Sequence, residues 1–306
     1  MTTASTNTAI DHTSDAGFRT WVAEIITQLL AVGLTQTADT GQINTASVTR
    51  PAINTMAGYA IFRFNDTLHA TNPIFLKLQF GTGGSTTTPA MQLQVGRGSN
   101  GSGTLTGLTT ANVACLMNTA PTSTITPYSS RFCYNATQGF LGLVFKWGYN
   151  ASTVGALGGF YVFRSTDAAG DPTSDSTQVA TNASNTTGIA QGWYTQVISH
   201  INNIAYTTSP WPSSSFFANA APYNVTGTLY GTDVQAFPVW QYTPVIGVSN
   251  QLGLCFNSEI AVNSTVSTAL VGSTNRTYLN VGLGIAGTIG YANFLTTSIG
   301  TLMLWQ

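Results

Sequence analysis

Charged residues are scarce in this sequence, and their scarcity narrows the partners that the protein can have. Only 6% of the 306 residues are charged, against about 25% in typical soluble proteins. The nine basic residues are spread singly along the chain, whereas binding to a phosphate backbone needs them in clusters. We therefore expect no nucleic acid partner. The lack of a basic amphipathic segment argues equally against docking on a membrane surface.

Long apolar runs are missing too. A membrane-spanning helix needs about 20 consecutive apolar residues, and no segment of the chain provides them. The opening residues, MTTASTNTAIDHTSD, lack the basic and apolar regions of a signal peptide. We therefore expect no membrane insertion, and the sequence predicts folding in a cytoplasm.

Cysteine is rare and unpatterned. Cys115, Cys133 and Cys255 are odd in number, lie far apart and include no C-x-x-C motif. Neither a disulfide framework nor a zinc site is indicated by such spacing. The sequence predicts three buried, reduced thiols.

Histidine is equally scarce, which limits nucleophilic catalysis. His12 lies in a polar N-terminal segment, His69 in an expected loop after NDTL, and His200 among strand-forming residues. No G-x-S-x-G motif, the signature of a serine nucleophile on a sharp turn, occurs. We therefore assign none of the three histidines to catalysis.

The sequence contains ten carboxylates, and only three of them form a cluster. Asp167, Asp171 and Asp175 lie in TDAAGDPTSDS, but their spacing of four differs from the alternating ligands of an EF-hand calcium loop. The pattern predicts a solvated loop between two strands. We expect no catalytic residue, no metal and no cofactor in this chain.

Glycan cleavage is the enzymatic alternative, because a pair of carboxylates suffices for it. The aromatic groups GWY at 192–194 and SPW at 209–211 could stack on sugars. Aromatic residues at strand ends more often close a sandwich core, however. The sequence therefore favours a non-enzymatic protein and leaves binding of a host surface glycan open.

Residues 14–33 carry the clearest helical pattern. Ser14 or Asp15 can cap its start, and Gly33 suits the position after its end. The i, i+3, i+4 spacing is carried by Phe18, Trp21, Val22, Ile25, Ile26, Leu29 and Val32. The pattern predicts an amphipathic helix that packs on the protein's own sheet, with docking on a partner chain as the alternative.

The residues before this helix have no such pattern. Residues 1–13 are small and polar, and Ile10 is their one large aliphatic side chain apart from Met1. Such a segment cannot bury enough apolar surface to order itself. It predicts a flexible N-terminal arm, or an arm ordered only by a neighbouring chain.

The rest of the chain alternates with the period of β-strands. In PIFLKLQF, the residues Ile74, Leu76, Leu78 and Phe80 share one face. Further alternating sets are Met91, Leu93 and Val95; Leu141, Leu143, Phe145 and Trp147; Phe160 and Val162; and Leu279, Val281, Leu283 and Ile285. Loops rich in Gly, Asn, Ser and Thr separate them. Residues 34–306 therefore predict a mainly β body, an antiparallel β-sandwich or jelly-roll-like fold, with a division into two subdomains left open.

One of these loops contains the glycine spacing that is typical of dinucleotide-binding sites. Gly96, Gly98 and Gly101 in QVGRGSNGSG spell G-x-G-x-x-G, but a dinucleotide site also needs a following helix and an acidic residue about 20 positions later. The residues that follow, SGTLTGLTT, are poor helix formers, and no Asp or Glu occurs between Asp66 and Asp167. The motif therefore predicts a hairpin loop, with Asn100-Gly101 at a turn that needs positive φ.

Several longer stretches carry a resemblance. They are DTGQINTASVTRPAINTMAGYAIFRFND (39–66), PIFLKLQFGTGG (73–84), GFYVFRSTDAAGDPTSDS (159–176), RTYLNVG (276–282) and the terminal GTLMLWQ. Together they resemble virion structural proteins of tailed bacteriophages. The resemblance implies a particle component without enzymatic activity, assembled in the host cytoplasm, whose partners are other virion proteins and copies of itself.

Three hypotheses follow from the composition and the resemblance. The first is a structural protein associated with the tail or baseplate, acting through symmetric contacts between copies. The second is a head decoration or head-fibre protein, and the third is a tail-borne module that binds or cleaves glycans.

Overall fold

The protein is mainly β, with antiparallel sheets and one helix near the N-terminus, as the sequence predicts. The computed structural model describes residues 2–10, 12–117, 126–147, 156–167, 169–183, 192–199, 204–207, 236–241, 247–255, 265–268, 275–280 and 300–305.

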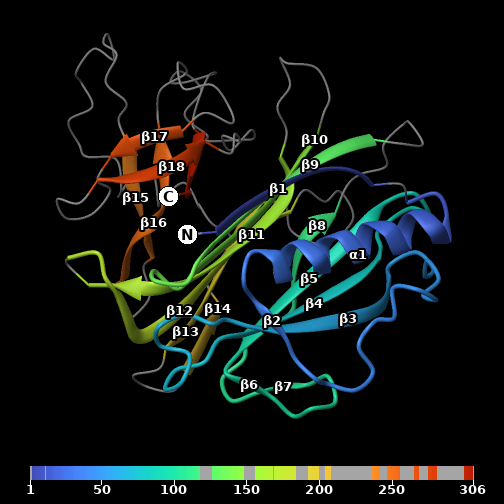
Figure 1. Cartoon of the computed structure of the whole chain (residues 1–306), viewed down its shortest axis with the longest axis horizontal. Coiled ribbons are helices and arrows are strands. Elements are labelled where there is room, and N and C mark those ends of the chain that lie inside the picture. Colours follow the sequence, from blue (N-terminus) through green and yellow to red (C-terminus); the bar gives the residue numbers. More distant parts are fainter. Residues whose placement is uncertain are drawn as a thin grey trace, which may run out of the picture.

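Three antiparallel ladders of strands form the body (Figure 1). The first ladder runs β2 (Thr35–Gln36), β3 (Thr55–Arg63), β4 (Phe75–Thr82), β5 (Pro89–Gly96) and β8 (Val113–Met117). The second runs β1 (Thr2–Ile10), β9 (Thr126–Asn135), β10 (Phe140–Trp147), β11 (Ala156–Thr166), β12 (Pro172–Ala183), β13 (Gly192–Ser199) and β14 (Ile204–Thr207). The third runs β15 (Ala236–Gln241), β16 (Gly247–Cys255), β19 (Gly300–Leu304), β18 (Arg276–Asn280) and β17 (Thr265–Thr268).

Strand β11 connects the three ladders. Its Gly158 pairs with Leu116 of β8, and its Thr166 pairs with Val248 of β16. A separate small hairpin, β6 (Gly98–Ser99) with β7 (Leu105–Thr106), extends from the end of β5. Distant parts of the sequence therefore meet along β11.

The first and second ladders share one core, as expected of a β-sandwich. Along β4, Leu76, Leu78 and Phe80 are fully buried, while Lys77 and Gln79 between them are partly exposed. The core combines both ladders, and its members include Phe62, Met91, Leu93 and Val95 from the first and Leu141, Leu143, Phe145, Phe160 and Val162 from the second. The alternation in the sequence is confirmed for these residues. Trp147 and residues 281–285 lie outside the described side chains.

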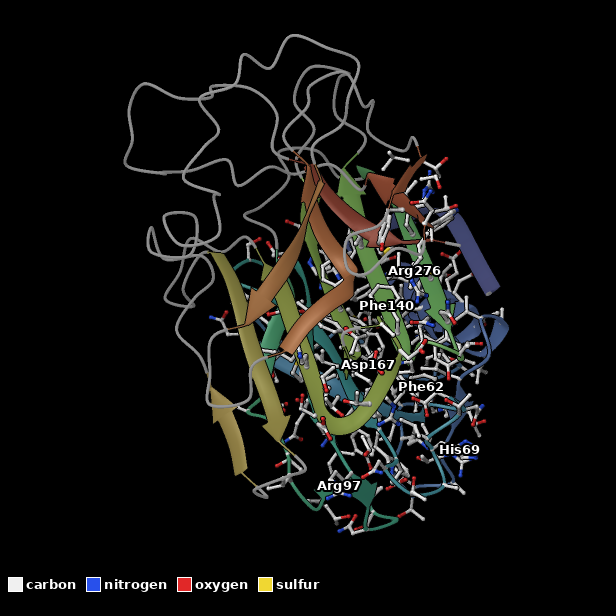
Figure 2. All side chains as sticks on the ribbon, turned by 90° about the vertical axis from the view of Figure 1, so that its left-hand side faces the viewer. Phe62, His69, Arg97, Phe140, Asp167 and Arg276 are labelled. Atoms are coloured by element: carbon white, nitrogen blue, oxygen red, sulfur yellow. The ribbon has the colours of Figure 1, made fainter. Side chains whose placement is uncertain are left out.

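The middle of the second ladder is buried on both faces, which the sequence did not predict. Phe140 and Tyr161, on the opposite face from the shared core, are also buried; Figure 2 marks the position of Phe140. On this face, a Cβ added to Gly142 would overlap the sulfur of Met303 in β19. The third ladder therefore covers the outer side of β10, so this strand is apolar on both sides.

Helix α1 (Asp15–Ala31) has the predicted ends and the predicted buried face. The Ser14 hydroxyl accepts a hydrogen bond from the backbone N–H of Gly17 at 3.0 Å and caps the start. Gly33 has φ +111, and the backbone N–H of Leu34 donates to the Leu29 carbonyl at 3.1 Å, which is a Schellman ending. The Trp21 ring packs edge-on against Phe80 of β4 at 5.8 Å, so the helix packs on the protein's own sheet.

The N-terminal arm differs from its prediction. Residues 2–10 form strand β1, which pairs over its whole length with residues 126–134 of β9 in the same chain. Backbone hydrogen bonds do not depend on apolar side chains, so a polar segment can be ordered by a sheet edge that already exists. Figure 1 shows β1 running beside β9 and α1.

Candidate functional site

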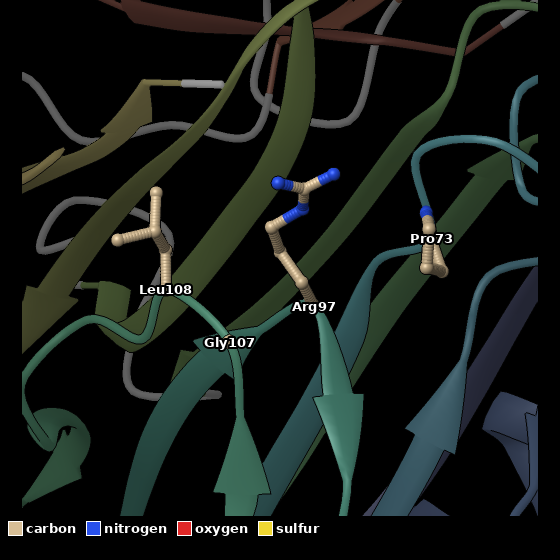
Figure 3. A pocket seen from close by; sticks show the side chains of 4 residues that line it. All are labelled: Pro73, Arg97, Gly107 and Leu108. Carbon is tan, nitrogen blue, oxygen red and sulfur yellow. The ribbon is translucent and has the colours of Figure 1, made fainter. Parts of the chain in front are cut away.

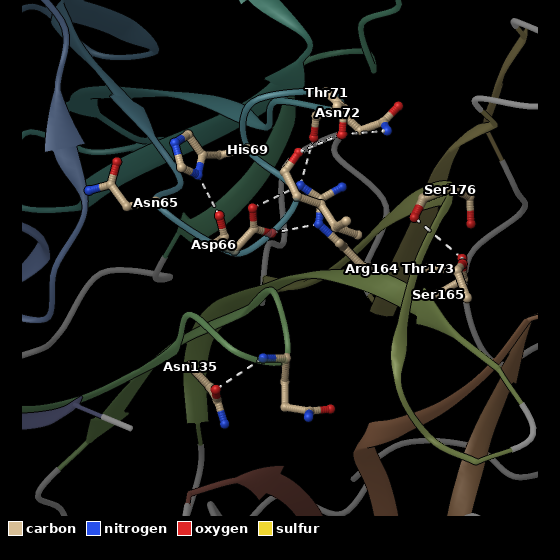
Figure 4. A network of polar contacts seen from close by, with 12 residues as sticks. Asn65, Asp66, His69, Thr71, Asn72, Asn135, Arg164, Ser165, Thr173 and Ser176 are labelled. Carbon is tan, nitrogen blue, oxygen red and sulfur yellow. Dashed lines mark hydrogen bonds and ion pairs between the residues drawn. The ribbon is translucent and has the colours of Figure 1, made fainter.

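Two opposite charges meet in the interior, between the loop after β3 and strand β11 (Figure 4). Asp66 is 2% exposed and Arg164 has no exposed surface. The Nε atom of Arg164 lies 2.5 Å from Asp66 Oδ2, and Nη2 donates to Asp66 Oδ1 at 3.0 Å. The planar guanidinium thus holds both carboxylate oxygens, the bidentate geometry that distinguishes arginine from lysine.

Strand periodicity brings both charges inside. Asp66 follows the buried Phe64 by two residues, and Arg164 follows the buried Val162 by two. Because alternate residues of a strand point to the same face, Arg164 continues a row of core side chains on β11, and Asp66 keeps the same two-residue spacing in the bend just after β3. The sequence prediction missed this pair, although a charge in phase with core residues on two apolar segments is a readable signal for it.

The pair fastens the loop at residues 64–74. Nη2 of Arg164 also donates to the Asn72 carbonyl at 2.6 Å, and the Asp66 carbonyl accepts from the backbone N–H of His69 at 3.2 Å. Gly139, with φ +58, lies so close that a Cβ there would be 2.8 Å from Asp66 Oδ2. We call Asp66, His69, Asn72 and Arg164 the Asp66 junction.

The junction is arranged to hold the structure together. A general base needs an oxygen that is free to take a proton, whereas both oxygens of Asp66 accept from Arg164. The Nη1 atom of Arg164 is buried and has no hydrogen-bond partner in the described part of the chain. Asp66 is buried and ion-paired in this arrangement, and the junction fixes the loop.

A cavity of about 340 Å³ lies beside the junction (Figure 3). Pro73, Arg97, Gly107 and Leu108 line it. Arg97 Nη2 donates to the side-chain oxygen of Asn72 at 3.3 Å, so this contact connects the cavity to the junction. Among the described residues, no carboxylate lies within 4.0 Å of the Arg97 guanidinium. We call this cavity, with the four described residues that line it, the Arg97 pocket.

The glycine motif at residues 96–103 is a hairpin, as predicted. Gly101 has φ +80, and the side-chain oxygen of Asn100 accepts from the backbone N–H groups of Ser102 and Thr104 at 2.9 and 3.1 Å. The segment that follows is strand β7, so no helix N-terminus faces these glycines. The local structure therefore lacks the strand, turn and helix order of a dinucleotide site.

Asp39 ties this hairpin to the loop before β3. It is 8% exposed, and its Oδ1 accepts from the Ser99 hydroxyl and from the Gly103 N–H at 3.1 Å. Its Oδ2 accepts from the Thr37 hydroxyl at 2.5 Å. Burial is the largest influence and would raise the pKa of Asp39, but the hydrogen bonds together outweigh it and lower this pKa from the usual 3.8.

Lys77 and Tyr59 hold the same hairpin from the sheet. The Lys77 ammonium donates to the Gly103 carbonyl at 2.7 Å and lies 4.5 Å from the centre of the Tyr59 ring. Burial lowers the pKa of Lys77, and the nearby Asp39 carboxylate opposes this shift. The Tyr59 hydroxyl donates to the Thr40 carbonyl at 2.6 Å. These charged groups serve to hold a loop in place.

The acidic segment forms a turn between two strands, as the sequence predicts, except that Asp175 lies within β12 and not in the turn. Asp167, Asp171 and Asp175 are exposed around the turn from β11 to β12. Asp167 Oδ1 accepts from the backbone N–H groups of Ala169 and Asp171, both at 2.9 Å. The described residues contain no group of three or more His, Cys, Asp or Glu side chains that could hold a metal ion.

The histidines occupy different environments. His12, expected in a polar arm, is 2% exposed; its Nε2 lies 3.0 Å from the Thr82 hydroxyl, and its ring packs edge-on against Phe18 at 5.4 Å. His69 lies in a loop, as predicted, with Nδ1 2.5 Å from the Asp66 carbonyl. His200 lies outside the described residues. The two described histidines are far apart in the sequence and have separate partners.

Two of the three cysteines are buried thiols without a disulfide, as predicted. They are Cys115 and Cys133. Burial raises the pKa of both thiols, that of Cys133 to about 12. A thiol with a raised pKa carries little thiolate and is a poor nucleophile. The side chain of Cys255 and the aromatic groups at 192–194 and 209–211 lie outside the described side chains.

No protein-family model, no curated protein and no solved structure matches this chain. In the described part, no helix is long and apolar enough to cross a membrane.

Proposed function

We propose that this chain is a non-enzymatic structural component of a tailed bacteriophage particle, associated with the tail or baseplate. It folds in the host cytoplasm and binds copies of itself and other particle proteins. The proposal depends chiefly on one observation: the charged groups that the described fold brings together fasten its own loops. The bidentate Asp66 and Arg164 pair and the buried Asp39 are the main examples.

Low charge supports a role in assembly. Nine basic and ten acidic residues in 306 leave a formal net charge of −1. Copies of such a chain repel one another weakly and lose little charge solvation when their surfaces meet. This composition suits repeated contacts between identical or neighbouring subunits.

The strand edges offer sites for such contacts. Strand β14 pairs with β13, and no second partner strand is seen for it within the described residues. An edge of this kind presents free backbone donors and acceptors, which can pair with another chain. The uncharged IAYT sequence of β14 adds no charge that would oppose this pairing.

The resemblance to virion structural proteins involves the same features. The stretch at 39–66 contains both Asp39 and Asp66, and the stretch at 159–176 contains Arg164. These stretches supply core strands and the residues that fasten the loops. The resemblance therefore concerns segments that build the body of the protein.

Labelling of purified phage particles tests the proposal. An antibody raised against the recombinant chain should bind intact particles at the tail or baseplate in electron micrographs, and mass spectrometry should detect the chain in the same particles. Label on the head would contradict the tail location and favour head decoration. Absence from purified particles would overturn the structural role.

An activity assay tests the non-enzymatic part. Purified protein should release no reducing ends from host capsule or lipopolysaccharide. Turnover that disappears on substitution of a single carboxylate would contradict the proposal and favour a glycan-cleaving module.

A further inference from the structure

The Arg97 guanidinium has spare capacity to bind a ligand. Its planar fork carries five N–H donors, and in the described part of the chain its side chain makes one hydrogen bond, at 3.3 Å, to Asn72. No described carboxylate lies within 4.0 Å to neutralise it. A charged fork that lines a cavity without a counter-ion is suited to bind an anion.

The local charge balance favours a single negative charge. The neighbouring guanidinium, Arg164, is already paired with Asp66 through both carboxylate oxygens. Arg97 therefore contributes the one unneutralised positive charge among the described groups around Asn72. A monoanionic carboxylate matches this balance better than a dianionic phosphate or sulfate, which would keep an unpaired charge.

The other lining residues fit a ring with an apolar face. The Pro73 ring and the Leu108 side chain form apolar walls on either side of Arg97 (Figure 3). The volume of about 340 Å³ is at the lower end of the range of ligand pockets, about 300–1,000 Å³. A single sugar ring, with C–H groups on one face and hydroxyls at its edge, suits such a space.

The hairpin fixes the backbone at Arg97 before any ligand binds. The backbone N–H of Arg97 donates to the Thr106 carbonyl at 3.2 Å. Gly107 has φ +75, and a Cβ there would be 3.0 Å from the Cβ of Arg97. A residue with a side chain at 107 would therefore crowd the arginine stem. Pre-ordering of this kind lowers the entropy cost of binding.

We propose that the Arg97 pocket binds the carboxylate of an acidic sugar residue. The guanidinium fork holds the carboxylate, and Pro73 and Leu108 contact the ring. Exposed carboxylate sugars occur on cell-surface polysaccharides, so the ligand class is an acidic surface glycan. This binding property is additional to the structural role and does not depend on it.

Titration with sodium D-glucuronate, followed by ligand-observed NMR on the full chain at constant ionic strength, tests this inference. The wild-type protein should bind glucuronate saturably and show weaker binding to D-glucose and to sulfate. Arg97→Ala should weaken glucuronate binding about tenfold or more, because loss of a charge-assisted contact of about 1.4 kcal/mol changes an affinity by that factor. Arg97→Lys keeps the charge but not the planar fork, so its affinity for glucuronate should lie between those of the wild type and Arg97→Ala.

Arg63→Ala is the matched control. Arg63 is partly exposed and, like Arg97, its Nη2 makes a 3.3 Å hydrogen bond to an asparagine side chain, that of Asn65. This variant should bind glucuronate like the wild type. Equal binding of glucose and glucuronate, or equal affinity of the wild type and Arg97→Ala, would overturn the inference. Incorporation of Arg97→Ala into particles should stay normal, so failure of this proposal is distinguishable from failure of the structural one.

Discussion

Asp66→Ala should be among the most destabilising single substitutions in the described part of the chain. Arg164 has no exposed surface, and Asp66 accepts hydrogen bonds from its Nε and Nη2. The substitution leaves a positive charge in the interior with the Asn72 carbonyl as its remaining described partner. Breaking one side of a buried pair costs about 3–5 kcal/mol, because the remaining charge keeps its desolvation cost. We expect a loss of that size in the free energy of unfolding.

A double-mutant cycle isolates the interaction energy between Asp66 and Arg164 from their contacts with other residues. Arg164→Met alone leaves the Asp66 carboxylate buried without its partner, whereas the double variant removes both charges. The double variant should be more stable than the sum of the single effects predicts, by about 2 kcal/mol. Urea unfolding followed by circular dichroism measures all four proteins, with comparison of the slopes to check that the unfolding reaction is unchanged.

A control substitution shows how much stability is lost when an arginine outside the junction is removed. Arg63→Ala removes a partly exposed arginine with no described ion pair, and it should change stability by less than about 1 kcal/mol. An Asp66→Ala effect no larger than that of Arg63→Ala, or additive effects of the two junction substitutions, would refute the reasoning that the junction fixes the loop.

Three other predictions concern the hairpin and the N-terminal strand. Gly101→Ala should cost about 1–2 kcal/mol, since φ is +80 there and the surrounding space is open; Gly103→Ala should cost clearly more in the same urea assay, because a Cβ would overlap the Tyr59 hydroxyl as well. Asp39 has a lowered pKa, so its contribution to stability is present above 3.8 and is lost as pH falls through the folded value; Asp39→Asn should flatten this acid limb of the stability curve, and an unchanged limb would contradict the assignment. Deleting residues 2–10 should open the edge of β9 and produce concentration-dependent association in light scattering, and a strictly monomeric truncated protein would count against β1 as the cover of that edge.

Local patterns in the sequence were sufficient for the helix and for the strand faces. The i, i+3, i+4 spacing with Ser14 before it and Gly33 after it gives both ends of α1, because capping depends on a few adjacent residues. The alternation around β4 gives its buried face for the same reason. Turn chemistry likewise identifies the hairpin at Gly101, where φ is +80.

Features set by distant contacts could not be predicted in this way. The burial of both faces of β10 depends on β19, which lies more than 150 residues further along the chain. The order of β1 depends on the edge of β9, and the burial of His12 depends on Thr82 and Phe18. In each case the local sequence is compatible with exposure, and only the partner decides the outcome.

Of the two candidate sites, one had a signal in the local sequence and the other depends on distant contacts. Asp66 and Arg164 are 98 residues apart, yet each is in phase with buried neighbours, so the pair had a signal in the alternation. No sequence signal marked Arg97 as a pocket residue, because its place beside Pro73 and Leu108 depends on how the hairpin folds back on the loop before β4. A lone arginine in a glycine-rich loop is compatible with full exposure to solvent.

Cryo-electron microscopy of the intact phage particle can locate this chain directly. We expect repeated copies of this fold at the tail or baseplate, related by the symmetry of the particle, with contacts between subunits that include exposed strand edges. A complete map and particle proteome in which every tail, baseplate and head protein is assigned, and this chain is absent, would contradict this expectation.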